Sequence, residues 1–289
     1  MKLRLSSLTI ALLGIAAAFT NLRAGETVAH GSGQTAAEAE DIGEITEAPP
    51  DNGMNGSKFR LNSGIRTQFT TNAELSGSHS SADLIFFPAI EAGYSSGLGH
   101  GFVFDITAIV EPGLYSSHTD RSFFGYSAQT TLSWSPSPKM PRFFIGAEPY
   151  RFDSFERDSL ITEAIGTLGG VDWGYSFNNG KSFLFAGYTF ENYFSNPTED
   201  NRLSNRVVVG ITEQLQPRLF AQLWYQYENS DYHNVDRSDN KHAVTLSLIY
   251  QFNKHLFGTL GESFVDNNST EQHASYQAIL SSAGLSWQF

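Results

Sequence analysis

The chain has 289 residues, and its 30 acidic and 18 basic side chains give a formal net charge of −12. Because phosphate binding needs clustered Lys and Arg, this balance argues against a nucleic-acid partner. The chain has no cysteine, which excludes a disulfide scaffold and a thiolate zinc site. We expect no cofactor and no metal site, and the 13% aromatic content together with 26 glycines favours β-strands.

The first 24 residues have the layout of a secretory signal peptide. Lys2 and Arg4 are followed by an apolar run that ends near Phe19 and then by small residues up to Ala24. A membrane-spanning helix needs about 18 or more apolar residues, and this run is shorter and interrupted by Ser and Thr. We therefore predict a signal peptide over 1–24, with cleavage after Ala24 or, as the alternative, in the alanine cluster 16–18.

The segment 25–57 differs sharply from what precedes it. It contains seven acidic residues, no Lys or Arg, no aromatic residue and the break Pro49-Pro50. Such a segment cannot bury enough apolar surface to offset the entropy lost on ordering. We predict a disordered acidic segment in the periplasm, and the alternatives are a lumen plug or a periplasmic docking arm.

From residue 58 onward, apolar and polar residues alternate with the period of two that is typical of β-strands. In the first segment, Phe59, Leu61 and Ile65 alternate with Arg60 and Arg66. Most segments reach the 9 to 11 residues or so that a tilted membrane strand needs. We predict twelve strands, approximately at 58–71, 83–95, 101–115, 122–135, 142–153, 163–177, 182–194, 204–214, 218–229, 241–252, 256–266 and 275–289.

The connections between these strands alternate in character. Those after odd-numbered strands are longer and rich in Ser, Asp, Asn and His, whereas those after even-numbered strands are shorter and carry Gly, Pro or Asn. Long outer loops, short inner turns and aromatic residues near strand ends, such as Trp134 and Tyr250, are typical of outer-membrane barrels. A soluble β-sandwich would show the same alternation, but it would not need the other features.

The last strand ends the chain on an aromatic residue. It reads YQAILSSAGLSWQF, with Leu285, Trp287 and Phe289 in one mostly apolar row. This ending resembles the C-terminal insertion signal of Gram-negative outer-membrane β-barrel proteins. The resemblance implies that a barrel-assembly machinery in the periplasm reads Leu285, Trp287 and Phe289, and that this strand pairs with the first to close a barrel.

Taken together, these features predict an all-β fold over residues 58–289, a transmembrane antiparallel up-and-down barrel of about twelve strands. Closure follows from the bilayer, because backbone polar groups in lipid must pair within the protein. The expected location is the cell outer membrane, with the N-terminus in the periplasm. The expected partners are outer-membrane lipid, lipopolysaccharide and the assembly machinery, and the sequence gives no oligomeric state.

The polar rows of the strands are expected to face the lumen. A barrel of eight strands has an interior filled by side chains, whereas one of sixteen leaves an aqueous channel. A barrel of twelve strands is intermediate, so the residues that line its lumen determine whether it can conduct. Because carboxylates outnumber arginines, a pore would favour cations or small polar solutes. The predicted pore-lining residues are Arg60, Arg66, Glu91, Asp105, Glu111, Glu148, Asp172, Glu191, Arg206 and Glu228.

Three strands have faces that alternation does not assign, at 142–153, 182–194 and 256–266. In the last of these, Glu262 shares its parity with Leu256 and Leu260. We expect this strand to be either bulged or out of register.

A small porin-like channel is the predicted function, and two alternatives stay open. The first is a structural or adhesive surface barrel whose lumen charges pair across it and close it. The second is an acyl hydrolase at the rim, because His273 and Ser275 form an H-x-S pair that resembles those of outer-membrane acyl hydrolases, although no orienting third group is evident. Loop carboxylates such as Asp153, Glu156 and Asp158 lack metal-ligand spacing and are expected to be solvated. The sequence thus gives only weak support to an enzyme.

Overall fold

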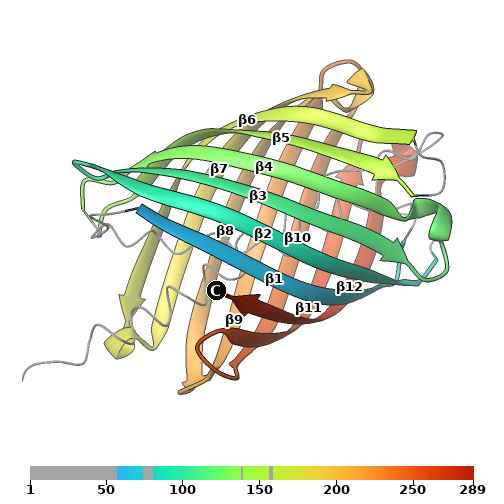
Figure 1. Ribbon diagram of the computed structural model, residues 1–289. Coiled ribbons are helices and arrows are strands. Elements are labelled where there is room, and N and C mark those ends of the chain that lie inside the picture. Colours follow the sequence, from blue (N-terminus) through green and yellow to red (C-terminus); the bar gives the residue numbers. More distant parts are fainter. Residues whose placement is uncertain (1–56, 74–80, 138, 156–158) are drawn as a thin grey trace, which may run out of the picture.

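The computed structural model describes residues 57–73, 81–137, 139–155 and 159–289 (Figure 1). The predictions for 1–24 and 25–57 lie outside these residues, apart from Ser57, and stay predictions. No helix in the described part of the chain is long and apolar enough to cross a membrane.

Twelve β-strands make up most of the described chain, joined by short connections and single turns of 3-10 helix. Their bounds agree with the predicted segments to within a few residues. The strands are β1 Ser57–Thr70, β2 Asp83–Gly99, β3 Phe102–Tyr115, β4 Phe123–Trp134, β5 Arg142–Ser154, β6 Ser159–Phe177, β7 Ser182–Asn196, β8 Arg202–Gln216, β9 Leu219–Tyr232, β10 Ser238–Gln251, β11 Leu256–Ser269 and β12 Tyr276–Gln288.

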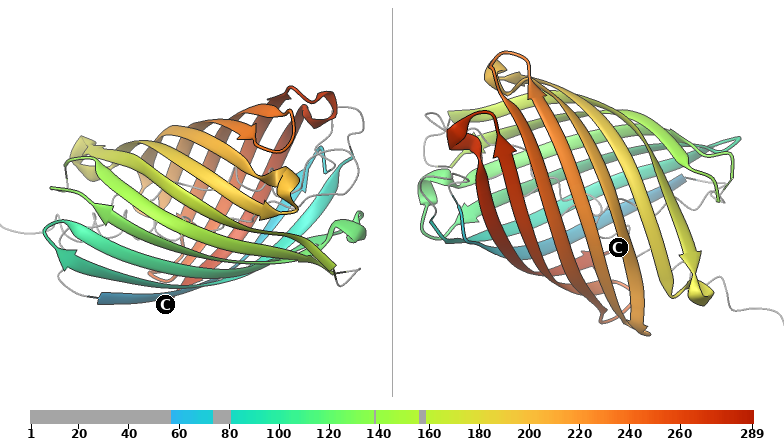
Figure 2. Two further views of the ribbon diagram at one scale, coloured as in Figure 1. Left: turned by 90° about the horizontal axis from the view of Figure 1, so that it is seen from above. Right: turned by 180° about the vertical axis from the view of Figure 1, so that it is seen from behind.

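The strands form one closed antiparallel barrel, in which each strand pairs with its neighbours in the chain and β12 pairs with β1. The closing register runs from Asn62 opposite Gln288 to Thr70 opposite Leu280. Figures 1 and 2 show the strands tilted around a common axis, with β1 and β12 side by side. Closure leaves no unpaired sheet edge. The predicted twelve-stranded up-and-down barrel is confirmed.

Exposed and buried residues alternate along the strands. On β1, Phe59, Ile65 and Phe69 are exposed, whereas Asn62 and Gln68 are buried. Successive side chains of a strand point to opposite faces, so in a closed barrel the exposed row faces outward and the buried row inward. The outward rows of most strands are apolar, which suits contact with lipid.

The expectation that the strand around Glu262 is bulged or out of register is wrong. β11 pairs without interruption with β10 from Phe257 to Ser269 and with β12 from Leu256 to Asn267. Continuous pairing fixes the parity, so the odd-numbered residues Ser263 and Val265 are buried inside, and Glu262 is exposed on the outer face. The backbone of β11 is therefore regular, and only the charged side chain of Glu262 departs from the apolar pattern of the outer row.

The two ends of the barrel differ less than predicted. We call the end with the connections after odd-numbered strands the loop end, and the other end the turn end. The longest connection, 71–82, lies at the loop end, but the connection 135–141 at the turn end is as long as 116–122 at the loop end. Two turn end connections have only two residues, 100–101 and 217–218, and in the first Gly101 has a φ of 82°, a conformation that side chains with a Cβ rarely adopt.

Candidate functional site

All ten residues predicted to line a pore lie on inward-facing rows of the barrel. Seven of them are buried, and Arg60, Arg66 and Asp105 are half-buried on rows whose other members are buried. The structure also assigns the two predicted residues on ambiguous strands, since Glu148 on β5 and Glu191 on β7 face inward. Their role in conducting a solute stays a prediction.

One group of inner charges spans β1, β2 and β3. Arg60 Nε lies 3.3 Å from Glu91 Oε1, and its Nη1 lies 3.9 Å from Asp105 Oδ1 on the strand beyond. Asn62 Nδ2 donates to the same Glu91 oxygen at 3.2 Å. Arg66 reaches across β2 in the same way, with Nη2 3.7 Å from Glu111 Oε1. The two arginines of β1 thus hold carboxylates of both following strands against the wall.

A second group centres on Glu228 of β9. Its Oε2 lies 3.2 Å from Arg206 Nε on β8 and 3.7 Å from Lys241 Nζ on β10. Arg206 also lies 3.4 Å from Glu191 Oε2 on β7, and the Ser230 hydroxyl donates to Glu228 Oε1 at 3.2 Å. Four consecutive strands therefore share one network of alternating charge.

A third group lies on β4, β5 and β6. Arg142 Nε donates to both carboxylate oxygens of Asp172, at 3.1 and 2.9 Å, and the guanidinium lies over the Phe144 ring. Glu148 accepts from Gln129 Nε2 at 3.0 Å. The two hydrogen-bonded contacts join adjacent strands, and the ring contact lies within β5.

The ion pairs between described residues on the inner face run along the wall. In the three groups above they join adjacent strands or strands two apart, and Arg237 and Asp239 form a further pair at the loop end. Pairing of this kind compensates buried charge locally, because each ion has an opposite charge and further hydrogen bonds close by. It does not require the two sides of the lumen to approach each other.

Sequence reasoning missed five inner charges, namely Asp83, Arg142, Arg202, Asp239 and Lys241, which all face inward. Arg202 and Asp239 precede the predicted starts of their strands, and Arg142 and Lys241 open theirs. The alternation, extended two residues before Ser204 and four residues before Ala243, would have included Arg202 and Asp239 in the inward rows. The inner face therefore carries more basic residues than predicted.

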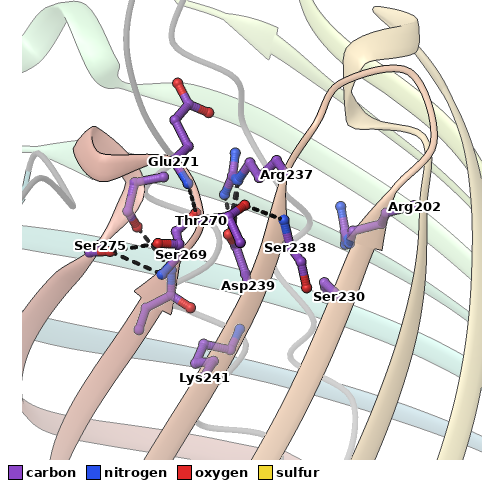
Figure 3. A network of polar contacts seen from close by, with 12 residues as sticks. Arg202, Ser230, Arg237, Ser238, Asp239, Lys241, Ser269, Thr270, Glu271 and Ser275 are labelled. Atoms are coloured by element: carbon purple, nitrogen blue, oxygen red, sulfur yellow. Dashed lines mark hydrogen bonds and ion pairs between the residues drawn. The ribbon is translucent and has the colours of Figure 1, made fainter.

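The loop end near β9 to β12 carries a polar network (Figure 3). Arg237 Nε donates to both carboxylate oxygens of Asp239 at 3.0 Å. The Ser238 N–H donates to Thr270 Oγ1 at 2.9 Å, which ties the start of β10 to the β11–β12 connection. Figure 3 shows Lys241 deeper along the same strand as Asp239, so this network continues towards Glu228.

The inner wall also carries apolar clusters that the sequence did not predict. One contains Phe87, Phe123 and Phe152 with Tyr150, and the ring centroids of Phe123 and Phe152 are 5.4 Å apart. The other includes Trp224. A cationic side chain contacts the first cluster, because the Arg66 guanidinium lies 4.2 Å from the Phe87 ring centroid. Polar and aromatic surfaces thus alternate inside the barrel.

The structure does not join His273 and Ser275 as a rim hydrolase would need. The Ser275 hydroxyl accepts from the Ser269 N–H at 2.9 Å and lies 3.3 Å from the Ser269 carbonyl, so it closes the β11–β12 connection. In the described part of the chain, His273 makes no hydrogen bond to Ser275. No group of His, Asp or Glu among the described residues could hold a metal ion, and Glu156 and Asp158 lie outside them.

Comparison with known proteins relates part of the chain to a family of β-barrel proteins. Residues 186–289, which include all of β8 to β12, match the protein family described as "Putative beta-barrel porin 2". The match covers less than half of the chain, so the chain is similar to that family over this part. No curated protein matches the chain.

Among solved structures, an outer membrane channel from Pseudomonas putida F1 is similar to this barrel, with a TM-score of 0.55, 10% identity, and coverage of 83% of this chain and 99% of that one. The KdgM porin solved with disordered oligogalacturonate has a TM-score of 0.47, 11% identity, and coverage of 79% and 99%. The TodX monoaromatic hydrocarbon channel, as a deltaS2 mutant, has a TM-score of 0.46, 10% identity, and coverage of 81% and 90%. At these identities the likeness concerns the fold. The family match and the closed barrel with an apolar exterior identify the chain as a β-barrel protein of the outer-membrane type.

Proposed function

We propose that this barrel is a porin-like channel for ions or small polar solutes. The observation that carries the proposal is that the inner charges pair from strand to strand around the wall, in the Arg60, Arg142 and Glu228 groups. Charges paired around the wall do not have to meet across the lumen, and the half-buried Arg60, Arg66 and Asp105 are the ones that a passing ion would contact directly. As part of the proposal, the barrel lies in the outer membrane with its turn end, where β1 begins, towards the periplasm.

Selectivity for cations is expected to be weak. Acidic side chains still outnumber basic ones on the inner face, but Arg142, Arg202 and Lys241 reduce the excess that the sequence suggested. The excess is greatest on β2 and β3, where Glu91, Asp105 and Glu111 face the two arginines of β1. These carboxylates are therefore expected to set the ion preference.

Conductance in planar bilayers tests the proposal. The full-length folded protein should give unitary conductance steps, and the reversal potential in a KCl gradient should report a modest cation preference. The double variant Asp105→Asn with Glu111→Gln should lower that preference. Glu262→Gln is the matched control, because it removes a carboxylate from the outer face and should leave selectivity unchanged.

A closed structural barrel is the second candidate, and the inward aromatic clusters around Phe123 and Trp224 favour it because they occupy lumen space. Folded protein that inserts into bilayers and never conducts would exclude the channel and leave this candidate. If the double variant conducts with the same ion preference as the wild type, the channel proposal stands. The carboxylates of β3 would then not set the ion preference.

A further inference from the structure

The loop end brings three polar side chains into a continuous line of hydrogen bonds. Ser81 Oγ lies 3.1 Å from His118 Nε2, and His118 Nδ1 lies 2.8 Å from Asp83 Oδ2. Ser81 belongs to the β1–β2 connection, Asp83 is the first residue of β2, and His118 belongs to the β3–β4 connection. The channel function gives this arrangement no role.

Donors from the β3–β4 connection hold the Asp83 carboxylate in place. It accepts from the N–H groups of Ser117 at 3.0 Å and His118 at 2.8 Å and from the Ser116 hydroxyl at 2.6 Å. Its side chain is completely buried. Three donors on one short connection fix both the carboxylate and the backbone that carries the imidazole.

The carboxylate determines which imidazole nitrogen carries the proton. An ionised carboxylate only accepts hydrogen bonds, so Nδ1 of a neutral His118 must be the protonated nitrogen. Nε2 then has a free lone pair, and the Ser81 hydroxyl must donate to it. This is the polarity in which an imidazole acts as general base towards a serine nucleophile.

The surroundings of Ser81 indicate the side from which a substrate reaches it. His118 has 26% of its side chain exposed, and Ser81 is half-buried. The Ser81 carbonyl accepts from the Ala73 N–H at 2.7 Å, and Ala73 belongs to the inner apolar cluster with Ile85 and Tyr115. These three side chains are at most 4% exposed, so an ester reaches the hydroxyl at the loop end, on the exposed side of the imidazole.

We propose that Ser81, His118 and Asp83 form an acyl-hydrolase site for carboxylic esters. Ser81 Oγ attacks the acyl carbon as its proton passes to His118 Nε2. The ester C–O bond then breaks, and the same proton leaves with the alcohol. Water attacks the acyl-serine, gives one proton through His118 to Ser81 Oγ, and releases the carboxylic acid. Asp83 stays ionised, orients the imidazole and stabilises its protonated form.

The test uses the full-length folded protein, a fluorophosphonate probe and p-nitrophenyl butyrate. The probe should label Ser81 with loss of fluoride, and peptide mass spectrometry should locate the adduct there. Ser81→Ala and His118→Gln should reduce labelling and ester hydrolysis to the level of buffer alone. Ser275→Ala is the control, because its hydroxyl closes a different connection at the same end of the barrel and should change neither readout.

Asp83 is a positioning residue, and its test separates orientation from folding. Asp83→Asn should shift the His118 proton from Nδ1 towards Nε2, visible in the 15N spectrum of the imidazole, and should slow labelling by on the order of a thousandfold. Retained heat-modifiable migration on a gel would show that the variant is folded. Folded wild-type protein that is not labelled, labelling that persists in Ser81→Ala, or an unchanged tautomer in Asp83→Asn would each overturn the proposal.

Discussion

Glu262 is a carboxylate on the outer face of the barrel, near the middle of β11. Leu260 and Phe264 flank it on the same face, and both are exposed. Leu246 and Ser281 lie opposite it on the neighbouring strands. Within the described ranges it has no ion pair, so its charge faces lipid without compensation.

Replacing Glu262 by Leu should stabilise the barrel in lipid. A lipid-facing charge near the bilayer centre costs free energy, and for an acidic residue the cost is roughly 1 to 2 kcal/mol. Denaturant unfolding in liposomes should show this gain, whereas in detergent micelles, where water reaches the surface, the gain should shrink. A loss of stability in liposomes would mean that Glu262 has a partner in the bilayer.

Replacing Glu228 by Ala should have the opposite effect. Removing this buried carboxylate leaves the Arg206 and Lys241 charges undercompensated, and breaking such a pair costs on the order of 3 kcal/mol. Unfolding in denaturant should report the loss. Glu228→Gln should lose less, because its amide can still bond Ser230 and the arginine. Glu199→Ala, at an exposed loop position, is the control and should stay within experimental error of the wild type.

At the scale of the element, β12 combines two features that the sequence could not separate. Leu285, Trp287 and Phe289 face outward, and their rings and side chains are substantially exposed. Phe289 makes one backbone hydrogen bond, its N–H donating to the Leu61 carbonyl at 2.9 Å. Its ring packs against Trp287 with centroids 6.0 Å apart. Phe289 therefore contributes little to the closed barrel itself, and its role as an assembly signal stays a prediction.

Deleting Phe289 should impair assembly in cells more than refolding in detergent. In detergent no machinery reads the chain end, and the lost contacts are one hydrogen bond and one exposed ring. Folded protein in outer-membrane fractions should fall severalfold, while the refolded yield from urea should be nearly unchanged. Trp134→Ala, another lipid-facing aromatic residue at the turn end, controls for loss of the aromatic girdle. Equal losses in both settings would make Phe289 a packing residue.

At the scale of the whole molecule, closure makes stability depend on every strand. Each strand has two neighbours, and the β12 and β1 ladder joins the ends of the chain. Partial unfolding would expose unpaired backbone along two edges, which is unfavourable in lipid or detergent. The barrel is therefore expected to open as a unit.

Unboiled protein should migrate differently from boiled protein on a detergent gel. The closed barrel binds less detergent than the extended chain, and it should persist until heating opens it. A chain truncated before Tyr276 lacks β12, so β1 and β11 become edges, and this variant should show no such shift. Identical migration of boiled and unboiled wild-type protein would contradict a closed barrel of this stability.

The sequence could predict the strands and their faces because both depend on local alternation. The period of two placed Asp105, Glu111 and Glu228 on their inner rows without knowledge of any partner. It failed at strand ends, where Arg202 and Asp239 lie beyond the predicted bounds, and at Glu262, where one charge in an apolar row looked like a break in register. The inward position of aromatic residues such as Trp224 was missed because the polar rows were expected to face the lumen. The inside of a barrel also accepts apolar side chains.

The sequence by itself determined the all-β architecture, the number of strands and the ladder that closes the barrel, because side-chain direction along a strand repeats over two residues and closure is imposed by the bilayer. Only the tertiary structure decided which charges meet. Arg60 reaches Asp105 across an intervening strand, and Ser81 meets His118 from a separate connection. Such contacts depend on register and on the approach of loops far apart in the chain, which no local pattern encodes.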